Sequence, residues 1–198
     1  EAFDFNLSGN DIYGRSEWRG RLTDNVRLIG GLDVFVLPGD FLYNGPTVQS
    51  TEGNAERGPN ATPFSNSDRI TESSDFTMVQ PAIYLESDLN VEPVRFVLGT
   101  RLDYYEEIQE YTFDPRLTAH YSLLEGTTLR GGVGMFSQPP EFQESSPQLG
   151  NPRLEPMRTV HVGAGVDREI TESFTVGVDG FYKHTSKRIV STEFGEAP

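Results

Sequence analysis

Apolar and polar residues alternate along residues 94–105. One set of alternate positions is apolar and ends in an aromatic residue: Val94, Phe96, Leu98, Thr100, Leu102 and Tyr104. The interleaved set carries two arginines and an aspartate: Arg95, Val97, Gly99, Arg101, Asp103 and Tyr105. Side chains point to alternate faces of a β-strand, so this period of two predicts a strand with one apolar and one polar face.

The same alternation recurs in other segments, at residues 12–22, 26–36, 79–85, 117–123, 129–135, 160–166 and 174–182. In none of these segments does the apolar set contain a charged residue. Each strand has room for about 9–11 residues, the length that a tilted membrane strand requires. The pattern predicts an all-β fold. It is an antiparallel meander of about eight strands, part of a large transmembrane β-barrel, with the apolar set toward lipid and the polar set toward a wet lumen.

The connections between these strands alternate between short and long. Short turns with turn-forming residues are predicted at 23–25, 90–93, 125–126 and 169–172. Long loops are predicted at 37–75 and 137–157. Outer-membrane barrels have short periplasmic turns and long extracellular loops. Both ends of the chain are then extracellular, so we interpret residues 1–198 as an internal part of a larger barrel domain.

Composition neither requires nor excludes a barrel. Hydrophobic residues make up 35% of the chain, and no run reaches the roughly 20 apolar residues of a membrane helix. A soluble β-sandwich that binds a ligand has a similar composition, and this alternative stays open. The net charge of −14 argues against a nucleic-acid partner, since the phosphate backbone requires a basic surface. The absence of cysteine excludes disulfides, thiol nucleophiles and cysteine-ligated metals.

The charged residues of the polar set are the candidate functional residues. We expect them to face the lumen, either as cross-strand ion pairs that support the wall or as part of a substrate path. These candidates are Arg15, Glu17, Arg19, Asp33, Glu86, Arg95, Arg101, Asp103, Arg116, His120, Arg130, His161 and Asp179. The residues chosen as lipid-facing are Leu98, Val133 and Val176. Aromatic girdles at the membrane interfaces are expected to include Trp18, Tyr104, Tyr121 and Tyr182.

Other patterns have simpler structural explanations. Residues 130–134 superficially match a phosphate loop, but no lysine or helix start follows, and the glycines suit a strand that bends. His120 and His161 have no third ligand nearby in the pattern, so no metal site is expected. The acidic turn at 106–110 lacks the spacing of a calcium loop. The pattern contains no catalytic arrangement, and we therefore expect no enzyme activity and no cofactor.

Several stretches resemble TonB-dependent outer-membrane receptors. The matching motifs are, in chain order, Gly99-x-Arg101-x-Asp103-Tyr104, Asp114-Pro115-Arg116, Leu129-Arg130-x-Gly132-x-Gly134, Gly150-Asn151-Pro152-x-Leu154-x-Pro156, and a strand with Phe181 and Tyr182. Met157 stands where the family usually has glutamate. The resemblance is strongest over residues 94–190, and the order and spacing of the motifs carry it.

This resemblance implies a plugged barrel that takes up a scarce solute, such as an iron chelate, a vitamin, a sugar or a peptide, driven by TonB. Its partners would be outer-membrane lipid, the rest of the barrel, a plug domain, TonB through a missing N-terminal region, and a small-molecule or protein ligand at the extracellular loops. The chain matches neither the plug domain nor the TonB box, so no gating residue carries over. An Oar-like branch of the family is linked to secretion and surface roles, so a barrel that binds a protein partner remains an alternative.

Overall fold

The described part of the chain forms one antiparallel sheet. The computed structural model describes residues 4–46, 69–145, 151 and 153–189. The chain divides into two compact units, one of Glu1–Ile12, Val36–Met78 and Val190–Pro198, the other of Tyr13–Phe35 and Val79–Ile189. All the predicted site residues lie in the second unit, which we call the sheet unit.

The described residues form nine strands and a helix of four residues: β1 (Asp4–Gly9), β2 (Ile12–Thr23), β3 (Val26–Pro46), β4 (Arg69–Val91), β5 (Val94–Tyr105), β6 (Glu110–Leu124), β7 (Thr127–Gln138), α1 (Phe142–Ser145), β8 (Met157–Thr171) and β9 (Phe174–Ser186). Strands β3 to β9 pair in chain order, and β1 and β2 both pair with β3. From β4 to β9, each strand pairs antiparallel with the next. The predicted meander is confirmed.

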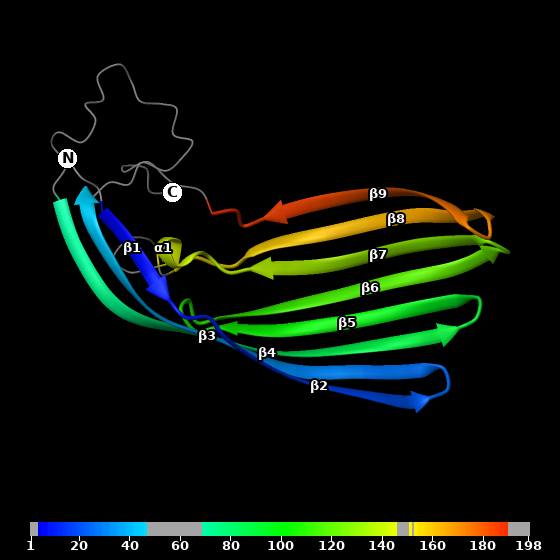
Figure 1. The fold of residues 1–198 in the computed structure, drawn as a ribbon, viewed down its shortest axis with the longest axis horizontal. Helices are drawn as coiled ribbons and strands as arrows, with labels where there is room; N and C mark the ends of the chain where they lie inside the picture. The colour runs from blue at the N-terminus through cyan, green and yellow to red at the C-terminus, as the bar shows by residue number, and fades with distance from the viewer. Residues whose placement is uncertain (1–3, 47–68, 146–150, 152, 190–198) are drawn as a thin grey trace, which may run out of the picture. The chain divides into compact units, whose positions relative to one another are not determined.

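The short turns lie together at one end of the sheet unit, at the right of Figure 1. The turn between β6 and β7 shows why the chain reverses there. Gly126 has a φ of 69°, in the left-handed region that favours glycine. Its carbonyl accepts a hydrogen bond of 2.8 Å from the Glu169 amide, which ties this turn to the end of β8.

The described residues form nine strands, one more than the predicted number of about eight, and the additional strand is β1. Its residues pair with residues 39–44 of β3, while β2 pairs with β3 elsewhere. The segment is only six residues long, too short for its alternation to be distinguished from a loop. Its pairing with β3 therefore decides its conformation.

The predicted loop at 37–75 is also too long. Strand β3 continues to Pro46 and β4 begins at Arg69, while residues 47–68 lie outside the described residues. Residues 38–39 are Pro-Gly, a pair typical of turns, but alternation continues past them, with Phe41 and Tyr43 buried. Pairing with β1 supplies the hydrogen bonds that keep this segment extended.

The apolar set of the sheet unit is largely exposed. Leu98 is 43% exposed, Val133 46% and Val176 43%. In a β-sandwich a second sheet would cover such a face, but the described residues form a single sheet. An extended exposed apolar surface marks a contact with membrane or another molecule. Among the described residues, no helix is long and apolar enough to cross a membrane.

Candidate functional site on the polar face of the sheet

The two predicted sets of side chains lie on opposite faces of the sheet unit. Directly paired residues of β5 to β9 form a polar row: Arg95, His120, Arg130, Gly165 and Asp179. Another row is apolar: Leu98, Leu117, Val133, Val162 and Tyr182. Residues directly opposite each other share a face. We call these faces the polar face and the apolar face.

Asp33 is the centre of the largest ion-pair network on the polar face. Arg15 of β2 donates two hydrogen bonds to the Asp33 carboxylate, of 2.7 and 2.9 Å, and Arg101 of β5 donates a third of 2.6 Å. Arg101 also contacts Asp103, with an N–O distance of 2.9 Å. Asp33 is only 2% exposed, and burying a carboxylate is costly unless it is paired in this way. The network connects β2, β3 and β5.

Tyrosines extend this network across β2 and β4. The guanidinium carbon of Arg15 lies 5.5 Å from the ring centroids of both Tyr13 and Tyr84, a distance at which cation–π attraction acts. The Tyr84 hydroxyl donates a 2.6 Å hydrogen bond to Glu17. Glu17 also pairs with Arg19, at 2.6 Å. The predictions did not include Tyr13 and Tyr84, although both occupy polar positions in the alternation.

Arg130 is the centre of a second network, which connects β7, β8 and β9. Its guanidinium lies 2.8 Å from the Asp167 carboxylate and 2.7 Å from that of Asp179. Glycines make room for these carboxylates. A Cβ atom at Gly165 would collide with the Asp179 carboxylate, and one at Gly177 would collide with that of Asp167.

Gly99 and Arg116 show the same relation between glycine and arginine. They lie directly opposite each other on β5 and β6. The Arg116 side chain passes over Gly99 and pairs with Glu86 of β4 at 2.9 Å. A Cβ at Gly99 would lie 2.5 Å from Arg116 Nε, so a larger residue there would block the path of the arginine.

The Asp114-Pro115 pair ends the backbone ladder between β6 and β7. The paired region of these strands begins at Arg116 opposite Gly134. Pro115 has no N–H to donate. The Asp114 carboxylate accepts hydrogen bonds from the Ser137 amide, at 2.9 Å, and from its hydroxyl, at 2.7 Å. A side chain therefore holds the last part of β7 where the ladder has ended.

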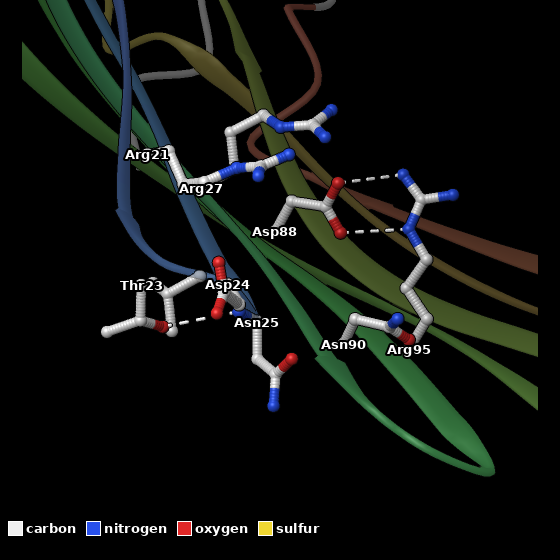
Figure 2. Close-up of a pocket in the computed structure, with 9 residues that line it drawn as sticks. Arg21, Thr23, Asp24, Asn25, Arg27, Asp88, Asn90 and Arg95 are labelled. Atoms are coloured by element: carbon white, nitrogen blue, oxygen red, sulfur yellow. Dashed lines mark hydrogen bonds and ion pairs between the residues drawn. The ribbon is translucent and has the colours of Figure 1, made fainter.

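A basic pocket of about 330 Å³ lies beside the turns that join β2 to β3 and β4 to β5. Figure 2 shows Arg21 and Arg27 side by side, with Asp88 between them and Arg95. Both Asp88 oxygens accept hydrogen bonds from Arg95, of 2.8 and 2.9 Å. Among the described residues, Arg21 and Arg27 form no ion pair. Asp88 was not among the predicted site residues, although it too occupies a polar position.

The two candidate histidines are not brought together. His120 lies opposite Arg130, whereas His161 lies opposite Gly134 and its ring packs 4.7 Å from that of Phe136. No group of three residues able to hold a metal ion occurs within the described ranges. The structure therefore offers no geometry for metal binding at these positions.

The acidic turn between β5 and β6 contains a half-buried carboxyl group. Gln80 donates a 2.9 Å hydrogen bond to Glu107 Oε1, while Glu107 Oε2 is buried without a partner. Burial raises the pKa of Glu107 above its ordinary value. The group is thus electrostatically unfavourable when ionised, and nothing around it forms a calcium loop.

The aromatic residues proposed for the girdles lie on the apolar face. Tyr121 is opposite Val94, and Tyr182 is opposite Val162. The rings of Tyr104 and Tyr111 pack at a centroid distance of 4.6 Å. All these residues belong to apolar rows, and Trp18 and Tyr182 are well exposed.

Comparison with known proteins identifies the architecture. A family model described as "TonB dependent receptor-like, beta-barrel" matches residues 2–197. No curated protein sequence matches the chain. Solved structures do match, and the chain spans about a quarter of the length of the first of them, since it covers 27% of that chain.

The ferric enterobactin receptor PfeA from Pseudomonas aeruginosa, as a G324V mutant, has a TM-score of 0.66 at 15% identity over 90% of this chain. The copper transporter OprC has a TM-score of 0.61 at 13% identity, over 89% of this chain and 30% of its own. The siderophore receptor PirA from Pseudomonas aeruginosa has a TM-score of 0.53 at 15% identity, over 91% of this chain and 41% of its own. At these identities the structural matches establish the fold, whereas the family model covers almost the whole chain. This chain belongs to the TonB-dependent receptor-like β-barrel family of the bacterial outer membrane.

Proposed function

We propose that the chain forms part of the barrel wall of an outer-membrane receptor that takes up a scarce solute through energy supplied by TonB. The observation that carries this proposal is the contrast between the two faces of one sheet. The apolar face has no cover among the described residues, as a surface toward lipid requires. The polar face is cross-linked by ion pairs, as a wet lumen permits.

In this proposal the polar face lines the lumen beside a plug domain. The paired residues, such as Asp33 with Arg101 and Arg130 with Asp179, connect strands that have one other strand between them, and so cross-link the sheet beyond its backbone ladders. Arg21 and Arg27, which line the basic pocket and form no ion pair with another described residue, are available for an anionic solute or for the plug. The named ligands of the similar structures, ferric enterobactin, copper and siderophores, suggest a metal or its chelate as the solute.

Uptake by cells tests this function. Cells that express the complete receptor are supplied with ⁵⁵Fe-labelled ferric chelates, or with a copper salt, beside cells without the receptor and cells without TonB. We expect accumulation of at least one probe that requires both the receptor and TonB. Accumulation that is equal in all the strains for every iron and copper probe would count against metal uptake. Receptor-dependent entry without TonB would contradict the coupling.

A further inference from the structure

The basic pocket on the polar face has walls that hydrogen bonds hold in place. The Asn90 amide donates a 2.9 Å hydrogen bond to the Asn25 carbonyl, which joins the end of β4 to the turn between β2 and β3. Across β4 and β5, Arg95 donates its two hydrogen bonds to Asp88. The pocket is therefore built from two neighbouring hairpins that are fastened to each other.

Two arginines of this pocket are accessible and unpaired. Arg21 of β2 and Arg27 of β3 both line the pocket, and both are exposed to solvent, so a solute can reach their guanidinium groups. Neither arginine forms an ion pair with another described residue. Like charges on neighbouring strands repel each other. An anion that enters the pocket would relieve this repulsion.

The two acidic residues that line the pocket do not balance these arginines. Both carboxylate oxygens of Asp88 accept hydrogen bonds from Arg95, and Asp24 forms no ion pair with any described residue. The pocket thus has three arginines against two aspartates, in a chain whose net charge is −14. A local excess of positive charge in a concave site raises the local concentration of anions.

Neutral hydrogen-bond donors line the pocket beside the arginines. They are the Thr23 hydroxyl and the side-chain amides of Asn25 and Asn90. Thr23 Oγ1 accepts a hydrogen bond of 3.3 Å from the Asn25 backbone amide, which leaves the hydroxyl proton available to donate (Figure 2). This set of donors suits an anion that has more acceptor oxygens than the two of a carboxylate.

We propose that Arg21 and Arg27 bind one phosphate group in this pocket, either as the free anion or as the monoester of a small solute. A guanidinium binds phosphate through paired N–H donors, and two guanidinium groups match the charge of a phosphate dianion. The remaining phosphate oxygens accept hydrogen bonds from the neutral donors. This site goes beyond the proposed function, because it depends neither on TonB nor on a metal.

A ³¹P NMR titration of the complete receptor in a neutral detergent tests the site. The probes are inorganic phosphate and glucose 6-phosphate, and acetate serves as a competing monocarboxylate. We expect saturable binding of one phosphate, which acetate displaces only at a much higher concentration. Tighter binding of glucose 6-phosphate assigns the site to a monoester, whereas equal or weaker binding assigns it to the free anion.

Arginine variants locate the site within the receptor. Arg21→Gln and Arg27→Gln should each weaken phosphate binding about tenfold, in keeping with the loss of a charged hydrogen bond. Arg21→Lys keeps the charge but not the paired donors, and it should weaken binding less than Arg21→Gln. The matched control is Arg153→Gln, which removes the same charge from an exposed position outside the pocket and should bind normally.

Three outcomes of these titrations would overturn the site. They are normal phosphate binding by both glutamine variants of the pocket, equal weakening in Arg153→Gln, and displacement of phosphate by acetate at an equal concentration.

Chemical modification distinguishes a small anion from an acidic side chain of the plug domain. The complete receptor is treated with phenylglyoxal, which modifies arginines, and the modified positions are mapped by mass spectrometry. Phosphate should protect Arg21 and Arg27 but not Arg153. If Arg21 and Arg27 resist modification even without phosphate, another part of the receptor covers them, and the small-anion site is overturned.

Discussion

At the scale of single residues, Asp33 explains how charge is accommodated on the polar face. Its carboxylate is almost fully buried, whereas Arg15 and Arg101 retain partial exposure. An exposed ion pair contributes about 0–1 kcal/mol, but a buried carboxylate with several hydrogen bonds contributes more. The network therefore fixes the positions of three strands as well as neutralising charge.

Replacing Asp33 with alanine should destabilise the receptor by about 1–3 kcal/mol, since two arginines lose their shared acceptor. The measurement is urea-induced unfolding of the receptor in lipid vesicles. Glu155→Ala is the control, because its pair with Lys187 is exposed on both sides, and its effect should stay below about 1 kcal/mol. Equal losses in the two variants would refute the special role of Asp33.

Glycines on the polar face permit a second residue-scale prediction. Gly165→Ala should destabilise the receptor by about 1–3 kcal/mol, because its Cβ would displace Asp179 from Arg130. Gly180→Ala is a matched control in the next strand, where nothing lies within 4 Å of the added atom. It should be neutral or slightly stabilising. The measurement is the free energy of unfolding of the two variants in chemical denaturant. An unchanged free energy of unfolding for Gly165→Ala would contradict the prediction.

The stability of the turn that contains Glu107 should depend on pH. Burial raises the pKa of Glu107, so the folded turn keeps a proton that the opened turn releases. The stabilisation is complete below the ordinary pKa of glutamate and is lost as the pH rises through the raised value. Hydrogen exchange at the Glu106 and Gln109 amides, corrected for its intrinsic pH dependence, should show more protection near about pH 4 than near about pH 7. Glu107→Gln should remove this difference, and its persistence would assign the effect to another group.

At the scale of elements, alternation predicted the strands and turn residues predicted the connections in the sheet unit. The turn at 125–126 is confirmed by the end of β6 and the start of β7. Alternation could not predict β1 or the full length of β3, because both depend on pairing between distant segments. The ion-pair partners also required the register, since a sequence indicates which face Asp33 occupies but not that it meets Arg101.

The Asp114 side chain is expected to control the end of β7. Asp114→Ala should leave the Ser137 amide without its acceptor, so hydrogen exchange should increase at residues 135–138. Residues 127–134 should keep their protection, because their ladder with β6 is unchanged. Hydrogen-exchange mass spectrometry of the receptor in micelles compares the two segments. Faster exchange along all of β7 would show instead that Asp114 supports the whole strand.

At the scale of the whole molecule, the family explains why so few of the described residues are buried. A soluble domain of this length covers its apolar side chains with its own residues. Here large apolar residues of β5 to β9, such as Leu98 and Val176, remain exposed on one face. Lipid would supply the missing cover, whereas water in the lumen would solvate the ion pairs.

Introducing an arginine should therefore impair membrane insertion on the apolar face but not on the polar face. Leu98→Arg places a charge on the apolar face and should cost about 2–4 kcal/mol near the membrane midplane. Val97→Arg makes that change one residue earlier in β5, on the polar face and opposite Asp88, where water and a carboxylate are available. Refolding of the complete receptor into lipid vesicles, followed by its heat-modifiable migration, measures insertion of each variant. We expect Leu98→Arg to lose membrane insertion and Val97→Arg to insert almost normally. The reverse result would assign the apolar face to the lumen. Equal losses of insertion would remove the distinction between the two faces.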